Sequence, residues 1–435
     1  MPPALSAVDT LFVLLSTALV LLMTPALALF YGGLVRAKSI LNTMMMSLVA
    51  VGVVGLLWAA VGYSLAFADG VTAVGGLSHA FLAGVGLEGR DATATIPHLL
   101  FFAYQGTFAI ITAALISGAV VERMRFPAYV LFLAAWTLLV YAPVAHWVWG
   151  GGWMHRLGIL DFAGGTVVHI TAGTAAWVAA LMVGPRRDHG RQAFLPHNVP
   201  MMLTGAALLW FGWIGFNGGS ALAVNGTAVQ ATVNTVLAPC AAMAAWIALE
   251  YRRTRRATAV GAGTALVVGL VAITPGCGFV SPLAALAIGA LTAVPCHYVI
   301  LWRARTRLDD SLDVLGAHGT GGAVGALLTG VFTSTAWGGP AGLLEGAPLQ
   351  LALQALGVVA AALYAAAATW AILALARRVT PLRLSARDEG AGIDVSEHGE
   401  EGYSDGEGAI LVLESAASLA PTTTHRVPTP LARSA

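Results

Sequence analysis

Apolar runs long enough to cross a lipid bilayer follow one another through most of the chain. A spanning helix needs about 20 predominantly apolar residues. Eleven such runs can be counted, at residues 9–31, 40–66, 97–120, 126–148, 162–184, 199–217, 228–250, 257–275, 280–301, 312–335 and 348–376. Only 10% of the 435 residues are charged, against about 25% in soluble domains. The sequence therefore predicts an all-α polytopic membrane protein with eleven transmembrane helices.

Basic residues are concentrated in alternate connections between these runs. The basic connections contain Arg36 and Lys38; Arg123 and Arg125; Arg186, Arg187 and Arg191; the 252–256 segment; Arg303, Arg305 and Arg307; and Arg377 and Arg378. The other connections carry only Arg90 and Arg156. Basic loops stay on the cytoplasmic side, so we expect the N-terminus outside and the C-terminus inside, which requires an odd number of helices.

The composition also predicts the domain boundaries. Residues 1–376 form the expected transmembrane domain, with an external connection at 67–96 that is expected to include a short surface helix. Residues 377–435 are charged, Gly-rich and finally Pro/Thr-rich, which indicates a cytoplasmic tail. Its end, from about Leu411, has low complexity and is predicted to be disordered.

Two segments repeat the same spacing of ionisable residues. Asp161 precedes His169 by eight positions in DFAGGTVVHITAG, and Asp310 precedes His318 by eight in DDSLDVLGAHGTGGAVG. The first and sixth helices likewise end in FYGG and FNGG. Helices 1–5 and 6–10 thus look like two copies of a five-helix unit. Because five is odd, the copies would be inverted, with the eleventh helix peripheral.

Ionisable residues inside a bilayer are costly and usually face a pathway. In apolar surroundings both histidines should be largely neutral, and two facing rings could share a hydrogen bond while binding a small polar solute. They could instead bond only to backbone carbonyls. We expect Asp161 and Asp310 to cap their helices and, with Asp313, to provide structural or electrostatic support. No metal or cofactor is expected, because no further ligand has suitable spacing.

Aromatic residues gather on the expected outer side together with one hydroxyl. They are Phe108, Trp149, Trp213 and Phe216, with Ser220 just beyond. Aromatic faces attract a cation, and a hydroxyl can accept a hydrogen bond from it. Trp also anchors helices at membrane interfaces, so the clustered set is more informative than any single member. It predicts a cation site at an outer pore mouth.

These motifs resemble the ammonium transporter family (Amt/Mep/Rh). The resemblance covers about residues 10–403 and rests on FYGGLVRAKSILN, ERMRF, DFAGGTVVHI, GWIGFNGGS, DVLGAHGTGG and GIDVSEHGEEGY. It implies that Trp149, Ser220 and Phe108 bind ammonium, with Trp213 assigned to the same outer group. Phe108 and Phe216 would form a gate. His169 and His318 would line the pore, and Asp161 would support the outer site without direct contact.

The family further implies homotrimers in the cytoplasmic (inner) membrane, one pore per subunit, and a tail that couples subunits and responds to a PII-type signalling protein. Trp149 together with Ser220 favours the bacterial Amt branch over Rhesus-type relatives. The sequence after Tyr403 departs from the family pattern, which leaves regulation open.

The predicted function is ammonium transport. Ammonium would be recruited outside and deprotonated, and ammonia would pass the gate and the histidines. Whether the proton follows separately is left open. An ammonium sensor that signals through its tail and a Rhesus-type neutral ammonia channel are the alternatives. A membrane enzyme is disfavoured, since no nucleophile or metal constellation accompanies the histidines.

Overall fold

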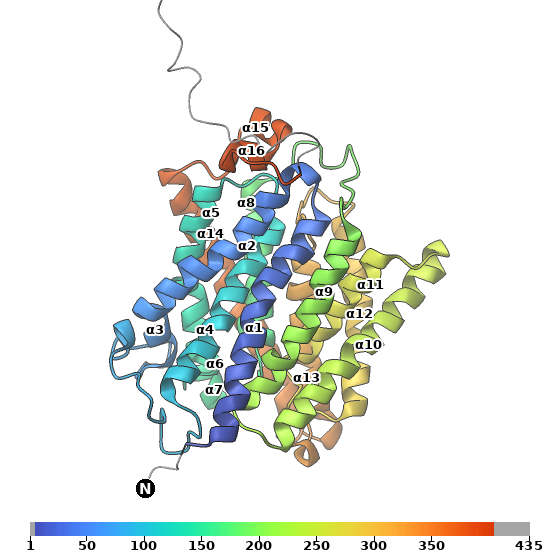
Figure 1. The fold of residues 1–435 in the computed structure, drawn as a ribbon. Coiled ribbons are helices and arrows are strands. Elements are labelled where there is room, and N and C mark those ends of the chain that lie inside the picture. The colour runs from blue at the N-terminus through green and yellow to red at the C-terminus, as the bar shows by residue number, and fades with distance from the viewer. Residues whose placement is uncertain (1–4, 404–435) are drawn as a thin grey trace, which may run out of the picture.

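Long helices run side by side through most of the molecule (Figure 1). This computed structural model describes residues 5–403. The main helices are α1 (Ala7–Leu34), α2 (Ile40–Leu57), α3 (Tyr63–Phe67), α4 (His98–Leu115), α5 (Phe126–Trp136), α6 (Ala142–Val148), α8 (Thr171–Val183), α9 (Val199–Trp213), α10 (Gly226–Thr254), α11 (Ala259–Ile273), α12 (Pro282–Arg303), α13 (Gly321–Phe332) and α14 (Pro348–Val379). Each of the eleven predicted runs contains a helix.

Nine helices in the described part, counted with their continuous 3-10 and π segments, are long and apolar enough to cross a membrane. This confirms the prediction of a multi-helix membrane protein. The other two predicted runs contain α11, with 15 residues, and α13, with 12 residues and continuous with the preceding π-helix.

Short π-helices interrupt or begin several of these helices. They are η2 (Trp58–Gly62), η5 (Thr137–Tyr141), η6 (Gly165–Ile170), η7 (Ile214–Gly218) and η9 (Leu315–Thr320). Such segments are rare and occur frequently at functional sites. Here η6 contains His169, η9 contains His318 and η7 contains Phe216. Three of the predicted pore residues therefore lie where the regular helix is broken.

The connection after α3 differs from the expected surface helix. It contains an antiparallel pair of two-residue strands, β1 (Gly70–Val71) and β2 (Val74–Gly75), followed by one 3-10 turn, η3 (Ala80–Leu82). The rest of the described chain is helical, as predicted, and this small hairpin is its one departure from helix and loop. The remaining short elements are α7 (Trp153–Leu157), η1 (Ala37–Ser39), η4 (Ile116–Ala119), η8 (Gly219–Ala221), η10 (Thr335–Trp337) and η11 (Leu343–Glu345).

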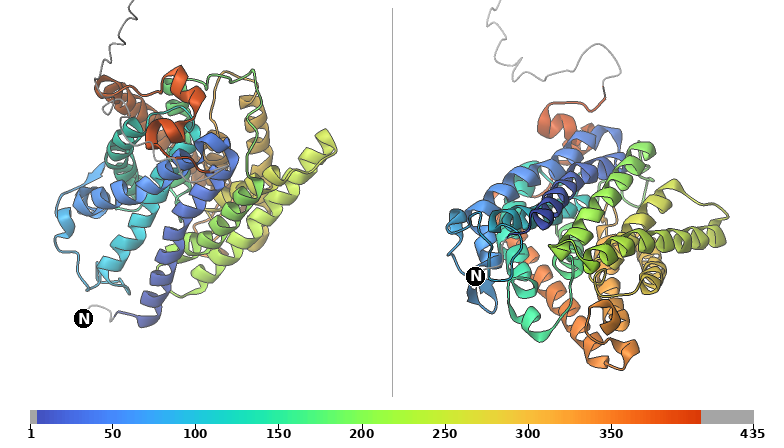
Figure 2. Two further views of the ribbon diagram at one scale, coloured as in Figure 1. Left: turned by 45° about the horizontal axis from the view of Figure 1, so that its top comes forward. Right: turned by 60° about the horizontal axis from the view of Figure 1, so that its bottom comes forward.

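The beginning of the tail folds against the end of the bundle opposite the N-terminus (Figures 1 and 2). Helix α14 continues to Val379, three residues beyond the predicted boundary, and α15 (Ala386–Ala391) and α16 (Ile393–His398) follow. The Asp394 carboxylate accepts hydrogen bonds from the N–H groups of Leu41 and Asn42, at the start of α2. The tail is thus held by a charge that caps a core helix. The low-complexity end predicted to be disordered lies outside the described residues.

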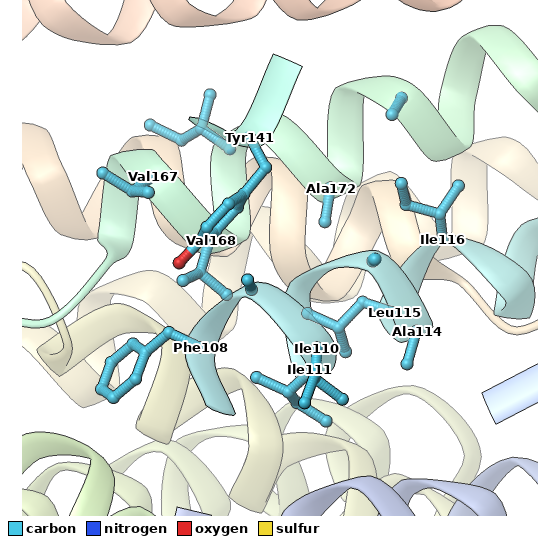
Figure 3. Close-up of a cluster of buried hydrophobic side chains, with 14 of the residues drawn as sticks. Phe108, Ile110, Ile111, Ala114, Leu115, Ile116, Tyr141, Val167, Val168 and Ala172 are labelled. Carbon is cyan, nitrogen blue, oxygen red and sulfur yellow. The ribbon is translucent and has the colours of Figure 1, made fainter. Parts of the chain in front are cut away.

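Glycines allow the two histidine-bearing segments to cross in contact. A Cβ added at Gly173 would collide with the backbone of Gly319, and one at Gly322 would lie 2.9 Å from the Gly165 carbonyl oxygen. Small residues permit this close approach between membrane helices. The other side of the first segment packs on α4, whose Ile111 and Leu115 lie in the buried cluster with Val168 (Figure 3). This packing fixes where His169 can lie.

Candidate functional site

Asp161 organises the start of the first histidine segment. Gly164 has φ 119°, a left-handed conformation that glycine adopts without steric cost. The turn that it permits brings four backbone N–H groups to the Asp161 carboxylate, those of Gly164 and Gly165 at 2.7 Å to Oδ1 and those of Thr166 and Val167 at 2.7 and 3.0 Å to Oδ2. The N–H groups at the start of a helix have no partner within it, so this carboxylate satisfies the whole first turn.

Asp310 begins the second segment in a related but weaker way. Asp313, three positions after Asp310, has a left-handed backbone with φ 59°. Gly164 has the same place and hand relative to Asp161. Asp310 Oδ2 accepts one hydrogen bond at 2.7 Å, from the N–H of Leu315. Asp310 Oδ1 is buried and has no hydrogen-bond partner within residues 5–403. Both aspartates therefore act at the start of a π-helix, and Asp161 satisfies more of the backbone.

The two histidines meet in the centre of the bundle. Their Nδ1 atoms are 3.2 Å apart, and their ring centroids are 5.2 Å apart with an interplanar angle of 30°. One Nδ1 must carry the hydrogen and the other must accept it. His169 is 1% exposed and His318 4%. His169 Nε2 has no hydrogen-bond partner in the described part of the chain, so it remains available to a guest molecule.

A narrow apolar cavity runs along the histidine pair. It contains both histidines together with Met23, Leu27, Phe30, Ile111, Leu115, Val168, Leu209, Trp213, Phe216 and Val267. Its volume is about 10 Å³, which is about the room that one water-sized molecule needs. Apart from the imidazoles, the wall offers almost no polar atom. Small neutral molecules fit this environment far better than hydrated ions.

Trp213 lies in this cavity rather than in the expected outer group. Its ring stacks on His169 with centroids 5.4 Å apart and an interplanar angle of 24°, and its Nε1 donates to Thr274 Oγ1. Sequence spacing alone could not show whether Trp213 lies in the cavity or in the outer group, because Trp213 and Phe216 are three residues apart on one helix face. The structure thus makes Trp213 part of the wall that holds His169.

Two stacked phenylalanines separate the cavity from the remaining aromatic residues. The rings of Phe108 and Phe216 have centroids 4.2 Å apart and an interplanar angle of 21°. Trp149 meets Phe108 edge-on, at 6.1 Å and 89°. Its Nε1 donates to the Asp161 carbonyl oxygen at 2.9 Å. The segment that begins at Asp161 therefore positions both Trp149 and His169.

Ser220 joins this group through Tyr104, which sequence reasoning missed. The Ser220 hydroxyl donates to the Phe216 carbonyl oxygen at 2.8 Å, and Tyr104 Oη lies 3.3 Å from Ser220 Oγ. The Tyr104 ring packs against Phe108, with centroids 5.0 Å apart. A tyrosine four positions before Phe108 on a helix was the available signal, since such residues share one face.

On the other side of the histidines, a vestibule of about 570 Å³ opens toward the tail end of the bundle. Phe30, Val267 and His318 line both this vestibule and the narrow cavity. Asp313 also lines it and is paired with Arg303, whose Nε is 2.7 Å from Asp313 Oδ1. The two spaces thus adjoin at these shared residues, and the surroundings are apolar at the histidines and polar beyond them.

A buried ion network lies beside this vestibule, and the sequence did not reveal it. Arg186 contacts Glu122 Oε2 at 2.5 Å and Asp309 Oδ1 at 2.8 Å, and Arg36 Nε contacts Glu122 Oε1 at 2.8 Å. Arg123, fully buried, donates to the Asp309 carbonyl oxygen. From the sequence, Arg123 and Arg186 are predicted only to be basic residues of the connections between helices. Their burial anchors the connection that leads into Asp310 and His318.

The arginines keep both carboxylates of this network ionised. Burial by itself would raise the pKa of Glu122, but the charges of Arg186 and Arg36 outweigh it and lower that pKa below its usual value. Burial likewise opposes ionisation of Asp309, whereas its hydrogen bonds to Arg186 and the charge of Arg123 hold its pKa well below the usual range. Both carboxylates thus stabilise the fold as anions.

A narrow buried cavity with stacked aromatic rings at one end and a polar vestibule at the other, inside a bundle of membrane-length helices, is typical of a membrane transport protein. Residues 11–403 match the Ammonium Transporter Family. An ammonium transporter of Bacillus subtilis is 45% identical over 400 residues, which cover 91% of this chain and 98% of the relative. This chain therefore belongs to the ammonium transporter family, as its motifs predicted, and the family is one of transporters rather than enzymes.

Solved structures agree with this assignment. Saccharomyces cerevisiae Mep2 superposes with a TM-score of 0.82 and 33% identity, covering 88% of each chain. A structure named Sensor Amt Protein superposes with a TM-score of 0.84 and 30% identity, covering 90% of this chain and 98% of that one. The fold is thus shared with both Mep and Amt proteins.

The two aspartates should differ in their effect on stability. In Asp161→Asn, one oxygen is replaced by an NH2 group that faces backbone donors, so we expect a loss of about 2–4 kcal/mol, given about 1–3 kcal/mol per unsatisfied buried group. Asp310→Asn removes far less hydrogen bonding and should cost about 1 kcal/mol or less. Thermal unfolding of the two purified variants measures this difference. Equal destabilisation would contradict the capping role given to Asp161.

The ion network gives a second stability prediction. Glu122→Gln leaves buried arginines without their full counter-charge and should destabilise the protein by about 3–5 kcal/mol. The exposed Glu88→Gln is the control, because it removes a charge at the surface. Since the pKa values of Glu122 and Asp309 are lowered by folding, their contribution is present above about pH 4 and is lost as the pH falls further. Unfolding temperatures measured from pH 7 to pH 3 should therefore converge for wild type and Glu122→Gln. A constant difference would refute this linkage.

Proposed function

We propose that this protein moves ammonium across the cytoplasmic membrane by passing ammonia along the His169–His318 pair. The observation that carries the proposal is the contact between these two buried rings in a narrow apolar cavity beneath the stacked phenylalanines. Membership of the ammonium transporter family supports the choice of substrate.

In this proposal ammonium is recruited by Trp149, Ser220 and Phe108. The ring faces attract the cation, with an energy of about 1–2 kcal/mol per contact. Ser220 Oγ donates its hydrogen to the Phe216 carbonyl oxygen, so its lone pairs remain free to accept a hydrogen bond from ammonium. Tyr104 holds Ser220 in place, and Asp161 orients Trp149 through its carbonyl oxygen without contacting the substrate.

Selectivity comes from the cavity rather than from the outer site. Potassium binds aromatic faces as well, so recruitment alone does not exclude it. Burying a bare cation costs many kcal/mol unless it is paired, and the cavity offers no carboxylate. Ammonium, unlike potassium, can give up a proton at the gate formed by Phe108 and Phe216, and in this proposal that proton crosses the membrane by a separate route, so that the net movement is that of ammonium. Ammonia then passes as a neutral molecule, accepting and donating hydrogen bonds at His169 and His318.

We propose that all eleven helices cross the membrane, with the N-terminus outside and the tail inside. The placement of α15 and α16 at the end opposite the N-terminus supports an odd number of crossings (Figure 1). The inverted repeat is supported by the matched series of an aspartate, a left-handed residue three positions later and a π-helix with a histidine. In this arrangement α14 lies outside the two five-helix halves, and residues 377–435 form the cytoplasmic tail.

We further propose a homotrimer in the inner membrane, with a PII-type protein as a partner at the cytoplasmic face. These features rest on the family resemblance. The docked tail segment that includes Asp394 supports a regulatory role for this face, because its contacts reach the starts of core helices.

A sensor with little transport is the second candidate, suggested by the structural likeness to the protein named Sensor Amt, but the more similar relatives named ammonium transporters do not favour it. A Rhesus-type neutral channel is a further alternative, disfavoured by the presence of Trp149 and Ser220 together. Uptake by purified protein in liposomes separates the candidates. Binding of ammonium without uptake would indicate the sensor, whereas uptake without net charge movement would indicate the neutral channel.

The outer site can be tested by its effect on apparent affinity. Trp149→Leu and Ser220→Ala should each raise the ammonium concentration for half-maximal uptake by about 5- to 30-fold, which corresponds to about 1–2 kcal/mol of lost cation binding. Trp370→Leu is the matched control, because that indole is 58% exposed on α14, away from the pore. Unchanged half-saturation in Trp149→Leu would show that the aromatic group does not recruit the substrate.

A further inference from the structure

A polar crevice of about 310 Å³ lies between the docked tail and the core, apart from the pore. The turn between α1 and α2 contributes Arg36 and Lys38, and the connection between α8 and α9 contributes Arg187, Asp188 and Gln192. Helix α15 closes the remaining side with Glu389 and Gly390. Three cationic side chains thus line one polar space.

Two of these cations have hydrogen-bonding capacity to spare. The ammonium group of Lys38 donates to the Gly390 carbonyl oxygen at 2.5 Å, which leaves two of its three hydrogens free. Arg187 is exposed, and its guanidinium makes one long hydrogen bond, 3.5 Å from Nη1 to the Ala386 carbonyl oxygen. Arg36 uses Nε for Glu122, and its guanidinium lies over the Phe194 ring at 5.0 Å. The N–H groups of Lys38 and Arg187 that these bonds leave free can donate to a bound anion.

The carboxylates of the crevice do not neutralise these cations. Glu389 is 4% exposed, and its oxygens accept from the Arg187 backbone N–H at 2.6 Å and from the Arg383 side chain at 2.7 Å. Arg383 thereby neutralises Glu389. Asp188 has no ion pair within 4.0 Å in the described chain, so it is the carboxylate of the lining that most directly opposes an anion.

We infer that this crevice binds a phosphate-bearing anion, which joins α15 to the core. The planar fork of an arginine and the compact charge of a lysine are the groups that recognise phosphate oxygens. The crevice lies at the lower end of the size range of small-molecule sites, so it accommodates a phosphate together with the group that carries it. That carrier is either a soluble phosphate ester or the headgroup of an anionic lipid, because basic pockets beside membrane helices bind such headgroups.

Such an anion would stabilise the docked tail. Lys38 and Arg36 belong to the core, whereas Gly390 and Glu389 belong to α15, so the complete site exists only when α15 is in place. A ligand that binds the docked state alone shifts the docking equilibrium by mass action. Tail docking would therefore respond to the phosphate compounds available at that membrane face. This inference does not depend on the proposed transport mechanism.

Titration of the full-length protein tests the site with defined probes. Inorganic phosphate and glucose 6-phosphate serve as soluble probes, at constant ionic strength with chloride as the reference. Nanodiscs of phosphatidylglycerol are compared with nanodiscs of phosphatidylcholine. Binding is followed by calorimetry, and docking by hydrogen exchange of residues 385–398. Protection by either soluble probe identifies a soluble phosphate compound as the ligand, and protection only in phosphatidylglycerol identifies the lipid headgroup.

Lys38→Gln and Arg187→Gln should each weaken binding by about tenfold or more, since each removes a charge-assisted hydrogen bond. Asp188→Asn should strengthen binding of the anion, because it removes a negative charge from the crevice. A variant that merely misfolds would not bind more tightly. Arg387→Gln is the control, because this exposed arginine of α15 does not line the crevice. The inference is overturned if neither source protects the tail, if Lys38→Gln and Arg187→Gln bind like wild type, or if Asp188→Asn binds no more tightly.

Discussion

The hydrogen bond between His169 and His318 imposes a demanding requirement on the rest of the fold. Two polar rings must meet inside an apolar bundle, each at the start of a helix that begins well inside the protein. Of the N–H groups that such helix starts leave unpaired, the Asp161 carboxylate accepts from four and the Asp310 carboxylate from one. The contact between Gly173 and Gly319 then lets the two segments approach closely enough for the rings to touch. The ion network around Arg186 holds Asp309 and thereby fixes the connection that leads into the second segment.

The same geometry explains how one narrow path can favour ammonia. A cavity walled by hydrocarbon and two neutral imidazoles provides hydrogen bonds without a fixed charge. Such a site lowers the energy of a small neutral molecule but cannot replace the hydration shell of an ion. In the proposed mechanism, the aromatic group on one side and the polar vestibule on the other confine this discrimination to one short section. In that mechanism, recruitment and selectivity are therefore carried by different residues.

Several features could be predicted from the sequence because their signals are strong and local. Membrane-length apolar runs located the helices, and the equal Asp-to-His spacing singled out His169 and His318. Other features depend on tertiary contacts. Trp213 lies three residues from Phe216, and only the packing shows that it stacks on His169. Arg123 looks like any basic loop residue, yet it is fully buried. The π-helices and the β1–β2 hairpin arise from short segments whose residue patterns do not differ from those of ordinary helix and loop.

The most direct test of the account is the electrical current that purified protein in liposomes produces on a solid-supported membrane. An ammonium pulse should give an inward current with wild-type protein, and a potassium pulse should give none, because the section lined by His169 and His318 excludes a cation that cannot lose a proton. In the double variant His169→Ala/His318→Ala the ammonium current should be lost, or the exclusion of potassium should fail. An unchanged ammonium current together with unchanged potassium exclusion in that variant would contradict the central role of the histidine pair.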